Sequence, residues 1–369
     1  MSALKVAWDN SFARRNLTGT GVYAARLLEQ LRQIDGCEIH VLERSPESTP
    51  AAGMLRRWQT LRNLWWIRYT LPDILRDGRF DLLHCPAYVA PRSAPCPVVI
   101  TMHDIIYRLY PQGFGWWWVW FMNRMTPAVR AAAAIICGSE CSKHDIVRAY
   151  ALPPERVHVI PYGVDHDRYH PGAKLDPAWA KKVGIRAGYV LHVGELSQRK
   201  NIPALLRAIA RLREQGRWNN RQLVLAGSGA PGMLGADDIY RVIAELDLRS
   251  SVVLAGRVPD EQLPGLYADA AVLVMPSLYE GFGFPVAEAM ASNTPVVCSN
   301  VSSLPEVAGD AARLVPPADV NALAAAIDDV LRNAALADEL RRKGLVQAQR
   351  FDWKRTAQAT HELYLSLAR

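Results

Sequence analysis

Short apolar runs alternate with amphipathic segments along nearly the whole chain of 369 residues. The runs are rich in Val, Leu, Ile and Ala, which is typical of strands buried on both faces of a parallel sheet. In the first half of the chain they lie at Val6–Trp8, Glu38–Leu42, Leu82–Cys85, Val98–Met102, Ala134–Cys137 and Val157–Ile160. In the second half they lie at Tyr189–Val193, Gln222–Ala226, Val252–Ala255, Ala271–Met275, Pro295–Cys298 and Ala312–Leu314.

The segments between these runs repeat apolar residues at helical spacing, most clearly at Val22–Gln33, Ile202–Gln215 and Val320–Asn333. Strands that alternate with helices predict parallel sheets covered by helices on both faces, which is the α/β class. Because each half of the chain carries six such runs, we predict two doubly wound, Rossmann-like domains.

A segment rich in Pro and Gly, 161–174, separates the two predicted domains. We place the first domain at 1–168 and the second at 169–352. The last amphipathic segment, 353–369, follows the second domain, and we expect this helix to pack back towards the first.

Composition excludes several classes of protein. Half of the residues are hydrophobic and 21% are charged, so the chain is not disordered. No apolar stretch reaches the roughly 18 residues of a membrane-spanning helix, and Asp9 stands where a secretory signal is apolar, so we expect a cytoplasmic protein. The six Cys and nine His form no CxxC or HExxH motif, and we expect no metal. We interpret the DxD pattern of Asp165 and Asp167 as linker charge.

Ligands of doubly wound sheets bind beyond the carboxyl ends of the strands, where helices begin. The sequence Thr18-Gly19-Thr20-Gly21 precedes one predicted helix, and its glycines allow backbone amides to approach a phosphate. By itself this motif fits an ordinary strand-to-helix loop equally well.

A second loop, Glu280-Gly-Phe-Gly-Phe-Pro-Val-Ala-Glu288, directly follows a predicted strand. Pro285 suits the first turn of a helix, so Gly281 and Gly283 form a loop whose amides can face a ligand. We place Glu280 before the helix and Glu288 in its first turn, where they can contact two ends of an elongated ligand. As isolated residues, Glu288 also fits a helix-dipole acid and Glu280 a solvated loop acid.

The third loop, His192 to Asn201, carries Arg199 and Lys200 side by side at a helix start. Two cations beside the positive end of a helix are unfavourable unless an anion neutralises them. A planar Arg fork and a Lys point charge suit a diphosphate, although a solvated basic loop is the alternative. His103, at the end of a first-domain strand, faces the predicted ligand edge, but a lone His also fits a structural role.

Together these segments resemble glycosyltransferase family 4, retaining enzymes of the GT-B fold, in which two Rossmann-like domains face each other across a cleft. The run from Pro276 to Asp319, with E-x7-E spacing, is similar to the family's donor-site signature. The sequence VGELSQRKNIPALLRA resembles its phosphate-binding loop, HDIIY its first-domain His loop, and VHVIPYGVDHDRYHP its interdomain stretch. The form SQRKN with SSLPEVAGDAA resembles the bacterial mannosyltransferase-like subgroup.

The resemblance implies a role for each matching residue. Glu280 would contact sugar hydroxyls at C3 and C4, and Glu288 the ribose hydroxyls. Arg199 and Lys200 would neutralise the diphosphate, and their division of labour stays open because Glu195 stands where many members carry Arg. His103 would lie near the sugar's C6 hydroxyl or the reacting carbon. The other implied donor-binding residues are Gly19, Gly21, Gly194, Arg257, Val258, Gly281, Phe282 and Gly283.

The resemblance also implies an activity. A hexose, with mannose from GDP-mannose as the best candidate, would pass from a nucleotide-sugar to a hydroxyl of a lipid-linked or polysaccharide acceptor in cell-surface glycan synthesis, without a metal or cofactor. A UDP-sugar or GDP-deoxysugar donor, or a sugar-nucleotide epimerase of related fold, are the alternatives. The near-neutral second domain argues against nucleic-acid binding, and the lack of GxGxxG argues against a dehydrogenase.

The net charge of +7 is concentrated in the first 170 residues, where 20 Lys+Arg exceed 15 Asp+Glu. Two segments there, 48–72 and 114–122, are rich in Trp, and the first also carries Arg without any acid. The residues singled out are Arg56, Arg57, Arg62, Trp65, Trp66 and Trp117. Trp beside Arg is typical of a helix in the head-group layer of a membrane. We therefore predict peripheral binding to an anionic cytoplasmic membrane face and a polyprenyl-diphosphate-linked acceptor; packing in the core or in a dimer interface is the alternative.

Overall fold

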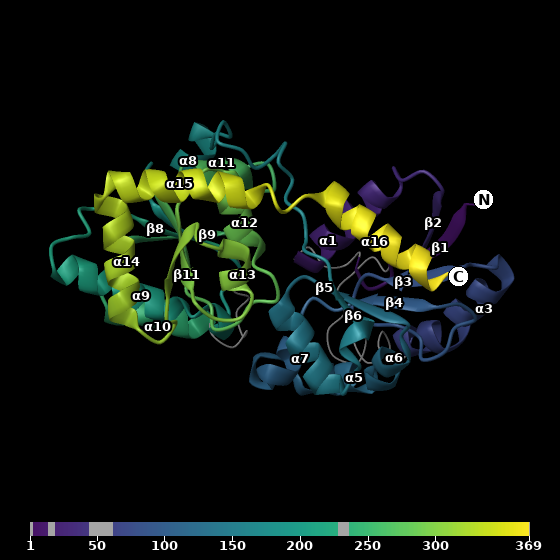
Figure 1. Ribbon diagram of the computed structural model, residues 1–369. Coiled ribbons are helices and arrows are strands. Elements are labelled where there is room, and N and C mark those ends of the chain that lie inside the picture. The colour runs from purple at the N-terminus through teal and green to yellow at the C-terminus, as the bar shows by residue number, and fades with distance from the viewer. Residues whose placement is uncertain (1–2, 14–18, 44–61, 228–235, 369) are drawn as a thin grey trace. The chain divides into compact units, whose positions relative to one another are not determined.

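The computed structural model describes residues 3–13, 19–43, 62–227 and 236–368 (Figure 1). Contacts divide the chain into two compact units, which we call unit 1 and unit 2. Unit 1 comprises residues 1–163 with 353–369, and unit 2 comprises residues 164–352. Each contains one six-stranded parallel sheet, and all twelve predicted strands are present, which confirms the predicted α/β class.

The sheet of unit 1 has the strand order β2-β1-β3-β4-β5-β6. Its strands are β1 Leu4–Asp9, β2 Cys37–Leu42, β3 Leu82–Cys85, β4 Val98–Thr101, β5 Ala134–Cys137 and β6 Val157–Val159. Its helices include α1 Gly19–Leu31, η1 Trp66–Thr70, α3 Leu71–Gly78, α4 Ile106–Leu109, α5 Trp116–Arg124, α6 Thr126–Ala131, α7 Glu140–Tyr150 and α16 Trp353–Leu367. The central strands β3, β4 and β5 are buried along their whole length, as the apolar runs predict.

The sheet of unit 2 has the order β12-β11-β10-β7-β8-β9. Its strands are β7 Val190–Val193, β8 Leu223–Ala226, β9 Val252–Gly256, β10 Val272–Met275, β11 Val296–Ser299 and β12 Ala312–Val315. Its helices include α8 Pro177–Val183, η4 Gln198–Lys200, α9 Ile202–Glu214, α10 Ala236–Glu245, α11 Leu263–Ala268, α12 Phe284–Ala291, α13 Leu304–Ala308, α14 Val320–Arg332 and α15 Ala334–Ala348. Helix α14 buries Leu323, Ile327 and Val330 at helical spacing.

The order of strands in unit 2 reverses direction between β7 and β10. From β7 the chain proceeds outward to β8 and β9, and β10 then returns to pair with the opposite side of β7. Loops that follow β7 and β10 therefore diverge from adjacent strand ends, which is the topological switch point where doubly wound sheets bind ligands. In unit 1 the corresponding point lies between β1 and β3.

The unit boundary falls after Gly163, five residues before the predicted 168/169 division. The intervening residues contact unit 2, because Val164 pairs with Asp352 and the Arg168 guanidinium donates to the Asp260 carbonyl at 2.8 Å. Helix α16 lies with unit 1, where its Thr356 hydroxyl donates to the Pro161 carbonyl at 2.8 Å.

Two predicted local details differ from the structure. Helix α1 already includes Gly19 and Gly21, so these glycines occupy its first turn and do not form a turn that precedes a helix starting at Val22. Helix α12 begins at Phe284, so Glu288 lies in its second turn and not in its first. Within the described parts of the chain, no helix is long and apolar enough to cross a bilayer.

Candidate active site

The switch point of unit 2 brings together the charged residues of two predicted loops. Arg199 and Lys200 lie in η4, the single turn between β7 and α9, and Glu280 lies in the loop between β10 and α12. The Arg199 guanidinium donates to Glu280 Oε2 at 2.6 Å, and the Lys200 ammonium donates to Oε1 at 2.7 Å. The Ser277 hydroxyl also donates to Oε1, at 2.6 Å. We call Arg199, Lys200, Ser277 and Glu280 the charged cluster.

Glu280 is a buried carboxylate, with 7% of its surface exposed. Burial opposes its ionisation, but the neighbouring charges of Arg199 and Lys200 outweigh that effect and lower its pKa to about 2. Burial also lowers the pKa of Lys200, and Glu280 counteracts this. The alternative of a solvated loop acid is therefore wrong for Glu280. Two cations and one carboxylate leave one net positive charge at the start of α9, where an anion is favoured.

Gly194 makes room for the Lys200 side chain. A Cβ atom on Gly194 would lie 2.9 Å from Lys200 Cε and 3.1 Å from its Nζ, and the backbone there has a φ of +148°. The end of β8 crosses the same place, because a Cβ on Gly227 would lie 1.8 Å from the Gly194 carbonyl oxygen. Asn201 fixes the loop from the other side, since its side-chain amide donates to the carbonyls of Pro276 and Pro317 at 3.1 and 2.8 Å. The geometry thus assigns Gly194 a packing role beneath Lys200.

Two serines that follow β11 hold the Glu280 loop in place. The Ser303 hydroxyl donates to the carbonyls of Glu280 and Phe282 at 2.9 and 2.7 Å, and the Ser302 hydroxyl accepts from the Glu280 amide at 2.9 Å. Gly283 caps α12 with a φ of +107°, a conformation that favours glycine. No role was predicted for Ser277, Ser302 or Ser303, although all three closely follow predicted strands at the ligand-binding edge.

Phe282 is 5% exposed, and its ring lies edge-on to that of Phe351, with centroids 5.4 Å apart. Its side chain therefore belongs to the core of unit 2, and its predicted contribution to a ligand is confined to its backbone. Gly281 is buried in the same loop. Arg257 directly follows β9 and is exposed, and Val258 is half-buried.

Glu288 contacts tyrosines instead of the end of its helix. The Tyr267 hydroxyl donates to Glu288 Oε2 at 2.8 Å. Burial raises the pKa of Glu288, and hydrogen bonds from the Tyr267 and Tyr169 hydroxyls counteract that effect. Because Glu288 lies in the second turn of α12, the alternative of a helix-dipole acid loses its basis.

His103 in unit 1 is a buried, neutral histidine. It follows β4, and its Nδ1 lies 2.9 Å from the Tyr162 hydroxyl. Burial lowers its pKa to about 4, against a smaller opposite effect of the Pro86 carbonyl. The Tyr23 ring lies edge-on to the imidazole with centroids 5.0 Å apart. At neutral pH this side chain can exchange hydrogen bonds with a ligand but carries no charge.

The DxD residues form a turn. Asp165 Oδ1 accepts from the Arg168 amide at 3.2 Å. Across residues 3–13, 19–43, 62–227 and 236–368, no group of three or more His, Cys, Asp or Glu is placed to hold a metal ion.

The Trp-rich segments divide into buried and exposed residues. Trp66 is 8% exposed and its indole donates to Asp9 at 3.4 Å, so its predicted membrane role is wrong and the core alternative applies. Trp65, its neighbour, is 64% exposed, and Arg62 is also exposed. Trp117 is half-buried and its ring stacks on that of Trp120 with centroids 4.6 Å apart. Arg56 and Arg57 lie outside the described residues.

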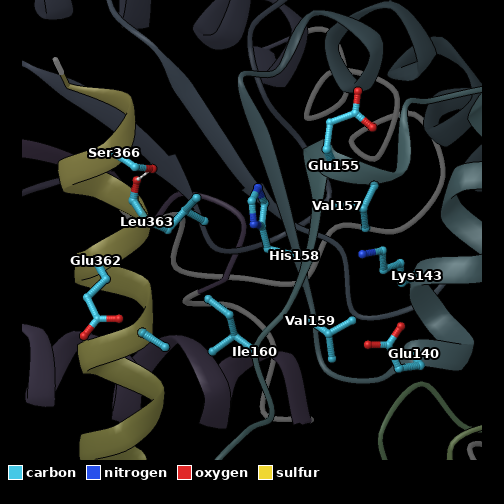
Figure 2. A pocket seen from close by; sticks show the side chains of 11 residues that line it. Glu140, Lys143, Glu155, Val157, His158, Val159, Ile160, Glu362, Leu363 and Ser366 are labelled. Carbon is cyan, nitrogen blue, oxygen red and sulfur yellow. Dashed lines mark hydrogen bonds between the residues drawn. The ribbon is translucent and has the colours of Figure 1, made fainter.

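A cavity of about 500 Å³ lies along the edge strand β6, between α7 and α16 of unit 1 (Figure 2). Glu140 and Lys143 of α7 line one side, and Glu362 and Leu363 of α16 line the other. None of the residues that the sequence singled out as site residues lines this cavity.

Both units match known families. Residues 177–346 match the family described as Glycosyl transferases group 1, and residues 17–168 match Glycosyltransferase Family 4. O-antigen chain mannosyltransferase B from Escherichia coli is 31% identical, over 98% of this chain and 99% of that protein. MMP alpha-(1->4)-mannosyltransferase from Mycolicibacterium hassiacum is 33% identical, over 78% of this chain and 71% of that protein.

Solved structures agree in fold. Sucrose-phosphate synthase from Thermosynechococcus elongatus superposes with a TM-score of 0.77 at 22% identity, over 99% of both chains. Anabaena HepE in complex with UDP-glucose superposes with a TM-score of 0.72 at 20% identity, over 99% of this chain and 100% of that one. These neighbours and the two six-stranded parallel sheets show the GT-B fold. Since both units match glycosyltransferase families and one curated relative is 31% identical along nearly the whole chain, the protein belongs to glycosyltransferase family 4 and is similar to its bacterial mannosyltransferases.

Proposed function

We propose that this glycosyltransferase moves mannose from GDP-mannose to a hydroxyl of a lipid-linked or polysaccharide acceptor in cell-surface glycan synthesis, with retention of configuration. The charged cluster at the switch point of unit 2 is the observation that carries the proposal. It offers a net positive charge at a helix start together with an ionised carboxylate. A nucleotide-sugar presents the complementary groups, a diphosphate anion and a set of sugar hydroxyls.

The chemistry follows from those charges. As the bond between the sugar C1 and the diphosphate oxygen breaks, negative charge grows on the phosphate and the sugar gains oxocarbenium character. Arg199, Lys200 and the amides of Gly281 and Gly283 stabilise the leaving diphosphate, each worth roughly 3–4 kcal/mol by analogy with an oxyanion-hole donor. Because these groups supply the positive charge, we propose that transfer needs no metal. Retention requires the acceptor hydroxyl to attack from the face that the diphosphate leaves.

Glu280 has the properties of a group that orients the sugar. With a pKa of about 2 it is ionised at every working pH, so it accepts hydrogen bonds from sugar hydroxyls. We assign the ribose hydroxyls to Glu288 and a hydrogen bond to the sugar to His103. Gly19, Gly21, Arg257 and Val258 remain candidate contacts to the diphosphate and the base.

The names of two relatives as mannosyltransferases favour mannose as the sugar. A UDP-sugar is the second candidate donor, because a structural neighbour was solved with UDP-glucose. Thermal shift with GDP-mannose, GDP-fucose, UDP-glucose and GDP separates these donors, since a ligand that binds the folded chain raises its melting temperature. Stabilisation by UDP-glucose alone would contradict the GDP-mannose assignment. The anomeric configuration of the product, read by NMR, tests retention, and full activity in EDTA tests metal independence.

The exposed aromatic residues of unit 1 support a proposed membrane surface. Trp116 and Trp118 of α5 are 70% and 46% exposed, and Trp65 is 64% exposed. The guanidinium of Arg124, in the last turn of α5, lies over the Trp120 ring at 4.6 Å from its centroid. Exposed indoles beside Arg suit an anionic head-group layer, and we propose that they bring the enzyme to a polyprenyl-diphosphate-linked acceptor at the cytoplasmic membrane face.

A further inference from the structure

Two tyrosines from separate parts of unit 2 converge on Glu288. Tyr267, in α11, donates its hydroxyl to Glu288 Oε2 at 2.8 Å. Tyr169 follows Val164, the first residue of unit 2, and its hydroxyl is close enough to Glu288 for each group to shift the pKa of the other. The two tyrosine rings lie edge-on, with centroids 5.8 Å apart. We call Tyr169, Tyr267 and Glu288 the tyrosine clamp.

The Tyr169 ring is fixed by contacts beyond the clamp. Its amide donates to the Asp165 carbonyl at 2.8 Å, which closes the turn that precedes it. The Arg168 guanidinium lies 5.5 Å from the ring centroid and donates to the Asp260 carbonyl at 2.8 Å. Tyr169 is 6% exposed, and a buried tyrosine hydroxyl needs a hydrogen-bond partner. Burial raises the pKa of the Tyr169 hydroxyl, and the neighbouring Glu288 carboxylate raises it further.

The residues around Glu288 affect the pKa of its carboxyl group. The titratable or charged groups that face this carboxyl are Tyr267 from α11 and Tyr169 and Arg168 from the segment before α8. Burial raises the pKa of Glu288, whereas the two hydroxyls and the Arg168 charge lower it. Tyr267 donates to Oε2, and Glu288 as a whole residue is half-buried.

We propose that Tyr169 and Tyr267 are positioning residues that hold the Glu288 carboxylate in the orientation that accepts hydrogen bonds from the ribose diol of the donor nucleotide. This inference rests on the proposed nucleotide-sugar donor and on the proposed ribose role of Glu288. It adds that the segment entering unit 2 is part of the nucleotide site, because Tyr169 belongs to that segment.

The test compares Tyr169→Phe with the wild-type chain by calorimetric titration of GDP and of 2′,3′-dideoxy-GDP. Phe keeps the ring and removes only the hydroxyl. We expect about tenfold weaker binding of GDP, the scale of one hydrogen bond to a charged group, and little change for the dideoxy nucleotide. In steady-state assays KM for the donor rises while kcat stays nearly constant. Loss of the hydroxyl raises the pKa of Glu288 further. As the pH is lowered, Glu288 is therefore protonated, and GDP binding is lost, at a higher pH than in the wild-type chain.

Tyr189→Phe is the matched control. Its hydroxyl is buried in the same unit and donates to the Leu266 carbonyl at 2.6 Å, without contact to Glu288. Tyr267→Phe tests the other tyrosine of the clamp. Like Tyr169→Phe, it should weaken the binding of GDP more than the binding of the dideoxy nucleotide. If Tyr169→Phe weakens the binding of both nucleotides equally, the proposed positioning role of the tyrosine clamp is wrong. The same conclusion follows if Tyr189→Phe weakens binding as Tyr169→Phe does.

Glu288→Gln separates the clamp from the function on which it rests. If Glu288→Gln leaves GDP binding unchanged, the ribose assignment is wrong and the clamp falls with it. If Glu288→Gln weakens GDP binding and Tyr169→Phe does not, only the clamp is wrong. If both weaken binding, the double variant should lose little more than Glu288→Gln alone, because the two residues act through one contact.

Discussion

The two units place different chemistry at the carboxyl ends of similar sheets. In unit 2 the strand ends carry a buried carboxylate paired with two cations at 2.6 and 2.7 Å. In unit 1 the end of β4 carries neutral groups: His103 bonds to Tyr162, and Thr101 bonds to both Tyr23 and His84 at 3.0 and 2.8 Å. Strand β1 ends at Asp9, a buried acid that accepts from the Trp66 indole at 3.4 Å. The same doubly wound topology therefore carries a carboxylate paired with two cations in unit 2 and a network of neutral hydrogen bonds after β4 of unit 1, and the loops decide which.

The strongest test of the charged cluster is Glu280→Ala. We expect transfer to fall by about a thousandfold, because the sugar loses its acceptor and the cations lose their orientation. Stability should fall by about 3–5 kcal/mol, since Arg199 and Lys200 are left partly or fully buried without their partner. Single-turnover assays and urea unfolding measure the two effects.

Glu280→Gln is the control, because it keeps the shape of the side chain and removes the charge. A folded Glu280→Ala chain with full activity would contradict the assignment. A variant that loses activity with unchanged stability would show that Arg199 and Lys200 reach water or another partner when Glu280 is absent.

The second test displaces the Lys200 side chain by a substitution at Gly194, without replacing Lys200 itself. In Gly194→Ala the new Cβ would lie 2.9 Å from Lys200 Cε and 3.1 Å from its Nζ, so the end of the Lys200 side chain must shift from its present position beside Glu280. We expect kcat to fall by about ten- to a hundredfold, which corresponds to partial loss of one stabilising donor. Gly216→Ala is the control for a methyl group added at a glycine of positive φ, here +66°, because nothing lies within 4 Å of its Cβ position. Equal losses in both variants would mean that backbone strain, and not Lys200, is responsible.

These cases show which parts of the site the sequence could predict. Arg199, Lys200 and Glu280 were predictable because each follows a strand at the ligand edge. Their ion pairs were not, because partners some 80 residues apart leave no periodic signal. Tyr169 was missed for a similar reason: it lies in the interdomain segment, which the sequence marks only as rich in Pro and Gly.

The Trp-rich segments show that the exposure of individual side chains is also hard to predict from the sequence. Trp65 and Trp66 are adjacent, yet one is 64% exposed and the other 8%. The four consecutive apolar residues 64–67 do not by themselves indicate which side of a helix faces the core. The strands of both sheets, by contrast, were all predicted, because each lies in a short run rich in apolar residues and central strands such as β4 and β10 are buried along their length.

The neutral state of His103 in unit 1 can be tested by measuring how the free energy of unfolding changes as the pH falls. Burial lowers the pKa of His103 to about 4, so the unfolded chain binds this proton more tightly than the folded chain. Its contribution to stability is therefore lost as the pH falls from about 6.5 towards 4, and by pH 5 the loss is about 2 kcal/mol. His103→Gln should lose less stability than the wild-type chain between pH 7 and pH 5, measured by urea unfolding. His170→Gln, at an exposed position, is the control. An unchanged pH slope in His103→Gln would show that the folded chain already protonates this imidazole.

The smallest effect is expected at the surface, where the two units also differ. Unit 1 exposes Trp116 and Trp118 on α5, whereas among the described residues of unit 2 the most exposed large hydrophobic side chain is Val346 of α15, at 68%. We expect the double variant Trp116→Ser/Trp118→Ser to bind anionic liposomes about tenfold more weakly in flotation assays, because two indoles leave the head-group layer. Activity on a soluble acceptor should not change, since both side chains already face solvent and their removal leaves no cavity. Val346→Ser should float like the wild-type chain. If the Trp variant also floats like the wild-type chain, the indoles do not bind the membrane, and an interface with a second protein would become the better account of their exposure.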